Sequence, residues 1–482
     1  MCGPWRLAVL IDMTSPMTGP KTRASVTLGA MFLLLLGVQA ARCAEPCCIQ
    51  VVEKGSRWPV PLVELRTTHN VRLVTDNAGV IAFDLPELMG RETWFDVVGY
   101  GYERPKDGFG FRGARLKPEP GQTLTVEVDR TIIARRLGRL TGGGIFAESQ
   151  KLGRELDWPE SGVLGCDSVQ NAVYREKLFW AWGDTTMSNY PLGIYDMTSA
   201  TTAPQPLASF EPPLRVRFNY FTDGKGVPRG VAKMPGAGPT WVSGYVCLLD
   251  KQGVPRLAGT YLKIKGFLDA YECGLCVWND RTDAFEQLRV LWTKSEAAPR
   301  HPPVPEGHPL FWKDAAGKEW VLFGNPLPRL KCQATFEAWQ DPSTWEVLKP
   351  QETLASAADD KPIKLHSGSV AWNPWRGRWV TVFMEALGKP SAFGELWYAE
   401  AAAPTGPWGK AVKVLSHENY TFYNPRLHPE FTPSDSPILI FEGTYTREFA
   451  DRPPATPRYD YSQILYRLDL DDPRLVPAHV TD

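Results

Sequence analysis

The sequence has 482 residues, which is more than one hydrophobic core usually organises, so we expect at least two domains. Its 53 basic and 54 acidic residues nearly cancel, and this balance argues against a protein that binds nucleic acid or an anionic membrane through its overall charge. The 43 prolines, 42 glycines and 18 tryptophans favour many short strands and tight turns over long helices.

An apolar run near the start of the chain predicts export. Residues 26–41 are almost continuously apolar, they follow Lys21 and Arg23, and small residues come after them, which is the pattern of a secretory signal. The run is short for a transmembrane segment, so we expect no stable membrane span after cleavage, with a membrane anchor as the alternative. We interpret residues 1–44 as a signal peptide with an over-extended start, and expect the mature protein in the periplasm, at the cell surface or outside the cell.

The cysteines leave two interpretations open. An exported protein can form disulfides, but a domain of this size does not need them. Cys273 and Cys276 have the spacing of a redox or zinc motif, yet no second pair accompanies them and they lie in a strand-like stretch. We therefore favour a structural role for both.

Residues 45–131 contain a series of short strands with alternating apolar residues. Asn, Pro and Gly separate the strands, and no helical period interrupts them, so the pattern predicts a β-sandwich. The stretches VPLVEL at 60–65 and TDNAG at 75–79 resemble the carboxypeptidase-regulatory-like, transthyretin-type domain. This resemblance implies a spacer or adhesion module without catalytic residues.

Residues 132–161 are predicted to be a linker. The segment 135–144 is basic and rich in glycine. It lacks the Lys-Ser/Thr of a phosphate-binding loop and the glycine spacing of a dinucleotide site, so we do not expect it to bind a nucleotide.

From residue 162 to 482 the chain repeats one theme five times, a polar strand followed by a turn and an aromatic-rich strand. The spacing of roughly 40 to 70 residues is irregular, which fits a five-bladed β-propeller better than a β-helix. We expect the last strand, within residues 459–470, to complete a blade with material from the start of the domain and so close the ring. The predicted fold is therefore all-β, with an N-terminal β-sandwich followed by a five-bladed β-propeller.

Polar side chains gather at the starts of the predicted units. In a propeller the inner strands line a channel, and their starts form a funnel where side chains from different blades meet. Six such groups are present: Asp167, Glu306, His308, His366, Asn424 and His428. This placement predicts a functional site, although the three histidines are alternatively hydrogen-bonded strand-end residues or ligands of a metal.

Short motifs in the first, third and fourth units carry a family resemblance. They are GCDSVQ at 165–170 with KLFWAWGDT at 177–185, PEGHP at 305–309 with KEWVLFG at 318–324, and LHSG at 365–368. These motifs resemble five-bladed glycoside hydrolases of the arabinanase and xylosidase type. The resemblance implies a polysaccharide or oligosaccharide ligand, Asp167 as general base, Glu306 as general acid and His366 near the pocket centre. It implies no cofactor, apart from a channel cation such as calcium that some of these propellers hold.

The resemblance is incomplete at one point. Glycosidic bond cleavage needs a protonated carboxyl beside the leaving oxygen and an ionised one opposite it. The resembled group also carries a third carboxylate that tunes the acid's pKa, and the nearest candidates, Asp269 and Glu272, are expected on outer strands. Two main hypotheses follow, an exported glycoside hydrolase-like protein and a non-catalytic carbohydrate- or surface-binding propeller. A propeller that serves as a protein-interaction scaffold is a third.

Further polar residues are candidates for substrate binding. The full set is His308, His366, Arg376, Glu385, Glu395, Asn424 and His428. Glu385 and Glu395 are alternatively buried partners of Arg376 or Arg378. We expect a monomer that binds no nucleic acid and has no dedicated metal site.

Overall fold

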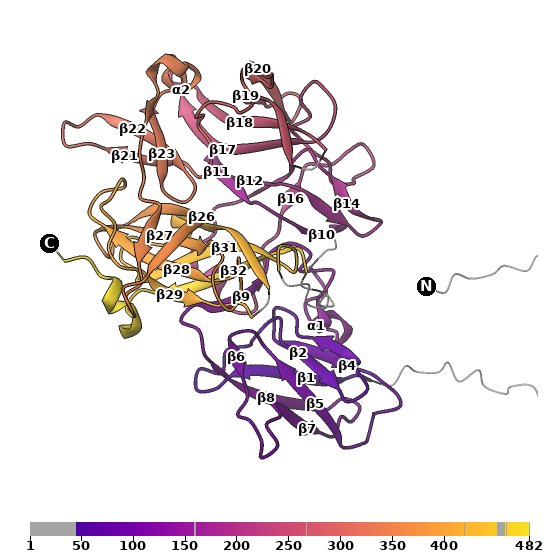
Figure 1. Cartoon of the computed structure of the whole chain (residues 1–482). Coiled ribbons are helices and arrows are strands. Elements are labelled where there is room, and N and C mark those ends of the chain that lie inside the picture. The colour runs from indigo at the N-terminus through magenta and orange to yellow at the C-terminus, as the bar shows by residue number, and fades with distance from the viewer. Residues whose placement is uncertain are drawn as a thin grey trace, which may run out of the picture. The chain divides into compact units, whose positions relative to one another are not determined.

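The computed structural model describes residues 45–158, 161–266, 268–418, 420–450, 458 and 460–481. The apolar run at 26–41 and the rest of the predicted signal peptide lie outside these residues. Within the described residues, no helix is long and apolar enough to cross a membrane. Most of the regular secondary structure in the described chain is β-strand (Figure 1), which confirms the all-β class.

The N-terminal part forms two four-stranded sheets. One has the strand order β4-β1-β8-β6 and the other β3-β2-β5-β7. The strands are β1 (Cys47–Glu53), β2 (Glu64–Thr67), β3 (Arg72–Val74), β4 (Val80–Phe83), β5 (Thr93–Val98), β6 (Tyr102–Glu103), β7 (Gly113–Leu116) and β8 (Thr123–Arg130). The sequence pattern did not indicate β6 and β7, because one has two residues and the other carries little apolar alternation.

These two sheets pack face to face through one apolar core. Ile49 and Phe83 come from one sheet, and Leu65 and Phe95 from the other, and all four are fully buried. The rings of Phe83 and Phe95 meet edge to face with centroids 5.6 Å apart. Because alternate residues of a strand point to the same face, this contact pattern is that of a β-sandwich, as predicted.

Five further sheets form the blades of the propeller (Figure 1). Neighbouring strands within each blade run antiparallel. The strand orders are β11-β12-β15-β16, β17-β18-β19-β20, β21-β22-β23-β24, β25-β26-β27-β28-β29 and β30-β31-β32-β9. Each of the five repeat units predicted from the sequence supplies one blade.

The blade strands have the following bounds. Blades 1 and 2 contain β11 (Gln170–Tyr174), β12 (Lys177–Trp182), β15 (Thr198–Thr202), β16 (Asn219–Tyr220), β17 (Thr240–Leu249), β18 (Pro255–Lys265), β19 (Asp269–Asn279) and β20 (Ala284–Thr293). Blades 3 and 4 contain β21 (Leu310–Lys313), β22 (Glu319–Gly324), β23 (Pro328–Gln333), β24 (Glu346–Val347), β25 (Thr353–Ala355), β26 (Pro362–Asn373), β27 (Arg378–Glu385), β28 (Leu396–Ala401) and β29 (Val412–Leu415). Blade 5 contains β30 (Thr421–Leu427), β31 (Ile438–Thr446), β32 (Ser462–Asp469) and β9 (Arg135–Arg139).

Shorter elements complete the described chain. A three-stranded sheet is built from β10 (Val163–Cys166), β13 (Thr185–Met187) and β14 (Tyr190–Ile194). The helices are α1 (Glu148–Lys151), α2 (Phe336–Gln340) and the 3-10 turns η1 (Leu207–Phe210), η2 (Pro342–Thr344), η3 (Pro429–Phe431) and η4 (Pro473–Ala478).

Aromatic side chains pack between the blades, as expected for the tryptophans of the strand centres. Trp180 and Trp182 of β12 in blade 1 are buried in one cluster with Ile440 and Leu465 of blade 5. Their two rings stack with centroids 6.0 Å apart. Flat rings of this size fill the space that opens between adjacent twisted sheets.

The ring of blades is closed by a strand that precedes the first blade. β9 pairs antiparallel with β32, with Arg139 opposite Ile464. This pairing confirms the expected closure of the ring, and it corrects the linker prediction, since residues 135–139 are the outer strand of blade 5. The segment looks like a linker in the sequence because of its arginines, yet Arg136 and Arg139 are buried. Their guanidinium groups donate to backbone carbonyl oxygens.

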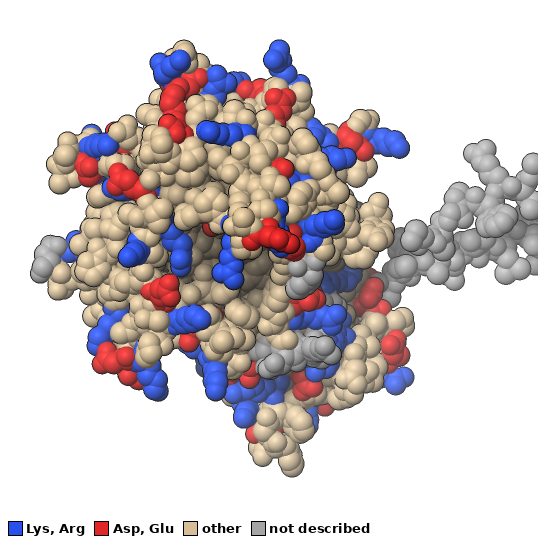
Figure 2. Space-filling model, turned by 45° about the horizontal axis from the view of Figure 1, so that its top comes forward, with Lys and Arg blue, Asp and Glu red and all other residues tan. Residues whose placement is uncertain are grey.

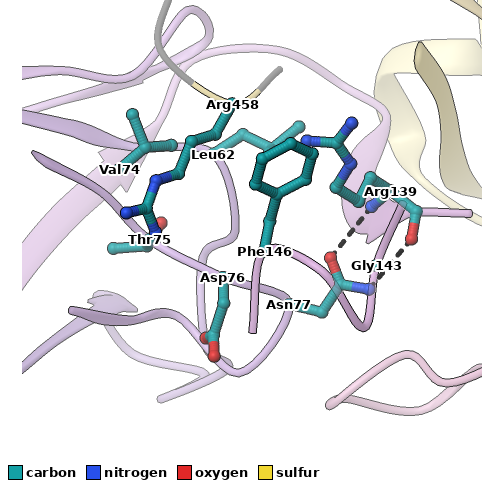
Figure 3. A pocket seen from close by; sticks show the side chains of 9 residues that line it. All are labelled: Leu62, Val74, Thr75, Asp76, Asn77, Arg139, Gly143, Phe146 and Arg458. Atoms are coloured by element: carbon teal, nitrogen blue, oxygen red, sulfur yellow. Dashed lines mark hydrogen bonds between the residues drawn. The ribbon is translucent and has the colours of Figure 1, made fainter. Parts of the chain in front are cut away.

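Asn77 of the sandwich is hydrogen-bonded to the closing strand. Its Nδ2 donates to the carbonyl oxygens of Arg139 and Leu214 at 2.9 Å each, and its Oδ1 accepts from the Arg139 amide at 2.9 Å. Figure 3 shows this amide facing the Arg139 backbone beside a small cavity of about 10 Å³. The Arg139 guanidinium lies 4.2 Å from the centre of the Phe146 ring. Because Asn77 is 3% exposed, these bonds tie the sandwich to the propeller.

Candidate functional site

Each of the five blades has a residue with positive φ in its inner strand or just before it. These residues are Ser168 at 52° and Gly307 at 86°, which precede β11 and β21, and Gly244 at 68°, Gly368 at 155° and Asn424 at 50°, which lie within β17, β26 and β30. Positive φ is uncommon outside glycine, so its recurrence marks equivalent positions in the five blades. The residues directly before these positions, which we call the funnel ring, are Asp167, Ser243, Glu306, Ser367 and Tyr423.

Hydrogen bonds between neighbouring blades connect the residues at and beside the funnel ring. Ser243 Oγ accepts from the Gly307 amide at 2.7 Å and so joins blades 2 and 3. Ser367 Oγ accepts from the Asn424 amide at 3.2 Å and joins blades 4 and 5. Asn424 Nδ2 donates to Ser168 Oγ at 2.7 Å and joins blades 5 and 1. Asn424, predicted to bind substrate, is thus engaged by its neighbouring blades.

Asp167 in blade 1 is enclosed by polar and aromatic groups. The Tyr423 hydroxyl donates to its Oδ2 at 2.6 Å. Burial raises the pKa of Asp167 to about 6, the Tyr423 hydroxyl lowers it, and the neighbouring Asp184 raises it. Gly183 lies so close that a Cβ there would be 2.3 Å from Asp167 Oδ1. Asp167 is therefore ionised at neutral pH, and it takes up a proton when the pH falls to about 6.

Glu306 in blade 3 precedes the inner strand β21. Burial raises the pKa of its carboxyl, while the cationic forms of His301 and Arg329 oppose that rise. The following Gly307 approaches a neighbouring strand so closely that a Cβ would lie 2.1 Å from the Gly324 carbonyl oxygen. The backbone conformation that presents Glu306 therefore requires glycine.

Asp167 and Glu306 stand two blades apart on the funnel ring, with Ser243 between them. The charge that raises the pKa of Asp167 is Asp184, whereas the charges acting on Glu306 are those of His301 and Arg329. Ser243 is uncharged, so blade 2 adds no carboxylate to the ring. Figure 2 shows one face of the molecule with a hollow near its middle and both basic and acidic side chains around it.

The two carboxyls considered for the third role lie on β19, the third strand of blade 2, as expected. Glu272 accepts from the Tyr261 hydroxyl at 2.8 Å. Asp269 accepts from Lys294 Nζ at 2.5 Å. Both carboxylates are thus engaged away from the inner strand.

A buried contact between blades 1, 3 and 5 crosses the interior of the propeller. Arg426 of β30 donates through Nη1 to His308 Nδ1 at 2.9 Å and through Nη2 to the Asn171 carbonyl oxygen at 3.1 Å. His308 is 5% exposed, and burial, together with the Arg426 charge, lowers its pKa. His308 is therefore a neutral acceptor for Arg426 and not a residue at the surface of the funnel.

His428 lies between two carboxylates. Its Nδ1 is 3.0 Å from Glu430 Oε1, and its Nε2 is 3.2 Å from Glu442 Oε1. His428 and Glu442 have no exposed surface. Burial by itself would lower the pKa of His428, but the two carboxylates outweigh it and raise the pKa. Glu430 and Glu442 therefore favour the protonated form of His428.

These side chains do not fit a channel cation. The Arg426 guanidinium already places a positive charge between His308 and Asn171. Across the described residues, no group of three or more His, Cys, Asp or Glu is arranged to hold a metal ion. The donors of this network are engaged with one another, so a cation would have to displace Arg426.

His366 and Glu385 lie together in blade 4. Leu365 stands opposite Glu385 in the β26–β27 pairing. The exposed His366 ring packs edge-on against Phe393 with centroids 5.2 Å apart. Glu385 accepts from the Trp397 indole at 2.9 Å. His366, next to Ser367 of the funnel ring, is the predicted histidine that stays accessible to a ligand.

Arg376 and Glu395 are held in ion pairs with other partners. Arg376 lies in the turn after β26, and its Nε is 2.7 Å from Glu400 Oε1. Glu395 is fully buried, and its Oε2 is 2.7 Å from Lys413 Nζ. Glu395 therefore pairs with Lys413, and the alternative that it pairs with Arg376 or Arg378 was wrong. Both residues serve packing within blade 4 rather than the funnel ring.

Sequence reasoning missed three members of the funnel ring, namely Ser243, Ser367 and Tyr423. A signal was present, because each blade has a polar or aromatic residue followed by Gly, Ser or Asn at the same place. Aligning Asp167-Ser168 with Tyr423-Asn424 would have identified the blade 5 member. Arg426 carried no such signal.

The seven cysteines in the described part of the chain are all free. Cys273 and Cys276 are buried on β19. Burial raises the pKa of Cys273 to about 12, so its thiol stays protonated. This environment suits a structural role.

No family model and no curated protein matches the sequence. Solved structures that resemble part of this chain include glycoside hydrolases. An exo-β-1,3-galactanase from Phanerochaete chrysosporium, solved with galactose, is 10% identical with a TM-score of 0.38 over 64% of this chain and 61% of that enzyme. This chain thus spans less than two thirds of that enzyme's length.

This chain matches a larger share of two further solved structures. A putative exo-β-1,3-galactanase from Bifidobacterium bifidum is 11% identical with a TM-score of 0.39 over 64% of this chain and 92% of that protein. A family 43 glycoside hydrolase from Bacillus licheniformis is 12% identical with a TM-score of 0.38 over 64% of this chain and 72% of that protein.

Proposed function

We propose that this chain is an exported, monomeric protein that hydrolyses glycosidic bonds of a polysaccharide at the funnel ring, with Glu306 as general acid and Asp167 as general base. One observation carries the proposal. The two carboxyls occupy equivalent positions just before the inner strands of blades 1 and 3, and burial raises the pKa of both. A carbohydrate hydrolase needs two carboxyls held by a rigid scaffold in environments that set their protonation.

The two environments differ in the hydrogen bonds that each carboxyl accepts. The Tyr423 hydroxyl donates to Asp167 and favours its ionised form, as a base requires. Glu306 has no such hydrogen bond among the described residues, so burial favours its protonated form. In the proposed reaction Glu306 gives its proton to the leaving oxygen while Asp167 removes a proton from the attacking water. Water thereby adds across the glycosidic bond, and the two carboxyls exchange their protonation states.

Residues outside the carboxyl pair have supporting roles in this proposal. His366 contacts the sugar from blade 4, because it is exposed and adjacent to Ser367. Residues 45–131, interpreted as a carboxypeptidase-regulatory-like module, act as a spacer or adhesion unit fixed to the propeller by Asn77.

A second candidate function is carbohydrate binding without catalysis. The observation that favours it is Ser243, which gives blade 2 a neutral side chain between the two carboxyls. With no carboxylate there, nothing on the ring besides burial holds the proton on Glu306.

Parallel binding and hydrolysis measurements distinguish the two candidates. Arabinan, xylan, galactan and sulfated algal polysaccharides would each be tested for retention of the protein and for release of new reducing ends. Release from one polymer supports the hydrolase, and tight retention without release supports the binding protein. Neither retention nor release on any polymer contradicts both.

A further inference from the structure

The turn between β6 and β7 of the sandwich exposes two phenylalanines. Phe109 is 91% exposed and Phe111 is 59% exposed, although both are fully apolar. All residues from 105 to 111 are exposed. Large apolar side chains displayed together on a loop tip indicate a surface that another apolar phase covers.

The turn is held in one conformation by its own hydrogen bonds. Asp107 Oδ1 accepts from the amides of Phe109 at 2.9 Å and Phe111 at 3.0 Å. The Asp107 amide donates to the Phe111 carbonyl oxygen at 2.9 Å, and the Gly110 amide donates to the Asp107 carbonyl oxygen at 3.0 Å. Because the backbone is fixed before any contact is made, little conformational entropy is lost when the two rings are covered.

Basic residues flank the two phenylalanines in the sequence. Residues 103–117 contain five basic and two acidic residues, although the whole chain has a net charge of −1. Glu103 pairs with Arg112 at 2.8 Å, and Asp107 is engaged by the turn amides. In the described chain, Lys106 and Arg115 are exposed and have no ion-pair partner. The local charge of this turn is therefore positive, opposite in sign to the net charge of the chain. The net charge argues against membrane attraction for the chain as a whole but not for this turn.

We propose that this turn docks on an anionic lipid bilayer, with Phe109 and Phe111 inserted at the interface and Lys106 and Arg115 facing the lipid headgroups. Phenylalanine offers no hydrogen-bonding group to a sugar hydroxyl, whereas it gains free energy by leaving water for the acyl boundary. Basic residues beside an inserted ring attract an anionic headgroup region and are screened by salt. This contact is peripheral and is independent of the function proposed for the funnel ring.

The test is co-sedimentation of the full chain with vesicles of equal parts phosphatidylglycerol and phosphatidylcholine. We expect the wild type to sediment with the vesicles. The Phe109→Ser/Phe111→Ser variant should lose at least about tenfold in vesicle affinity. Lys106→Glu/Arg115→Glu should also weaken binding, and added salt should weaken that of the wild type. Phe311→Ser, which changes a 55% exposed phenylalanine on β21, is the matched control and should bind like the wild type.

Several results would overturn the proposal. Equal sedimentation of the wild type and the double phenylalanine variant would show that the rings make no contact with lipid. Equal binding to pure phosphatidylcholine would remove the role of charge. Loss of polysaccharide retention in the double phenylalanine variant, with vesicle binding unchanged, would assign the turn to a polymer instead. An unchanged unfolding midpoint in the variants excludes misfolding as the cause.

Discussion

The hydroxyl oxygen of Tyr423 lies 2.6 Å from Oδ2 of Asp167, and the two residues occupy equivalent positions on adjacent blades. The hydrogen bond joins the last blade to the first directly at the proposed base. It also lowers the pKa of Asp167 against the effect of burial, which raises it to about 6.

Tyr423→Phe should therefore move the acid limb of the pH–rate profile. Asp167 acts as a base only when ionised, so kcat/KM of the wild type should fall as the pH drops through about 6. Removing the hydroxyl raises the pKa of Asp167, and the acid limb should shift upward by about one pH unit. Tyr190→Phe, which changes an exposed tyrosine on β14, should leave the profile in place. An unshifted limb in Tyr423→Phe would exclude Asp167 as the group that the profile reports.

Gly183→Ala should displace the Asp167 carboxyl. A Cβ at this position would lie 2.3 Å from Asp167 Oδ1, a distance that forces one of the two groups to move. Misplacing a catalytic group by about 1 Å lowers kcat by roughly a hundredfold. Gly224→Ala is the matched control, because a Cβ there meets no atom within 4 Å. Steady-state kinetics on the hydrolysed polymer would compare Gly183→Ala with Gly224→Ala. Equal kcat values would show that catalysis does not depend on the position of the Asp167 carboxyl.

Ser243→Asp would place a carboxylate beside the backbone that presents Glu306. Ser243 Oγ accepts from the Gly307 amide, and an aspartate oxygen can accept the same bond. The added negative charge disfavours ionisation of Glu306, so its pKa should rise further. We expect the alkaline limb of the kcat/KM profile to move to higher pH by about one unit. A downward shift would contradict Glu306 as the acid.

The His428 and Glu442 pair should show strong coupling in stability. His428→Ala leaves the fully buried Glu442 without its cation, and we expect a loss of about 3–5 kcal/mol in the free energy of unfolding. Adding Glu442→Gln removes the stranded charge and should recover at least about 1 kcal/mol. Denaturant unfolding of the wild type, both single variants and the double variant measures the coupling, and strictly additive losses would contradict it.

The pH dependence of stability follows from the same pair. The folded state raises the pKa of His428, so the stabilisation that its protonated form provides is present below pH 6.5. It is lost as the pH rises through the raised value, and this loss should be absent from the double variant.

Most of the fold could be predicted from the sequence, because strand alternation and turn residues are local signals. The blade strands around Trp180, Trp320 and Trp379 are examples, since each carries buried aromatic residues between turns. The closing strand β9 could not be predicted, because its arginines are satisfied by carbonyl oxygens that only the folded chain brings near. Its polar sequence resembles a linker until those partners are in place.

The site could be predicted only in part. Asp167 and Glu306 stand out because carboxyls beside Ser or Gly at the start of a unit are local features. The contact between Arg426 and His308 spans 118 residues and joins two blades, so no local pattern reveals it. His308 and His428 were selected by their position in the units, but their depth in the propeller depends on packing that spacing does not encode.

The most direct test of the proposed function is the release of new reducing ends from the responding polysaccharide by wild type, Asp167→Asn and Glu306→Gln. Glu319→Gln, which changes an exposed glutamate on β22, is the matched control. We expect both site variants to lose at least about a hundredfold in rate with polymer retention intact, and the control to match the wild type. Hydrolysis that survives in either site variant would contradict the assignment of Asp167 and Glu306 as the reacting pair.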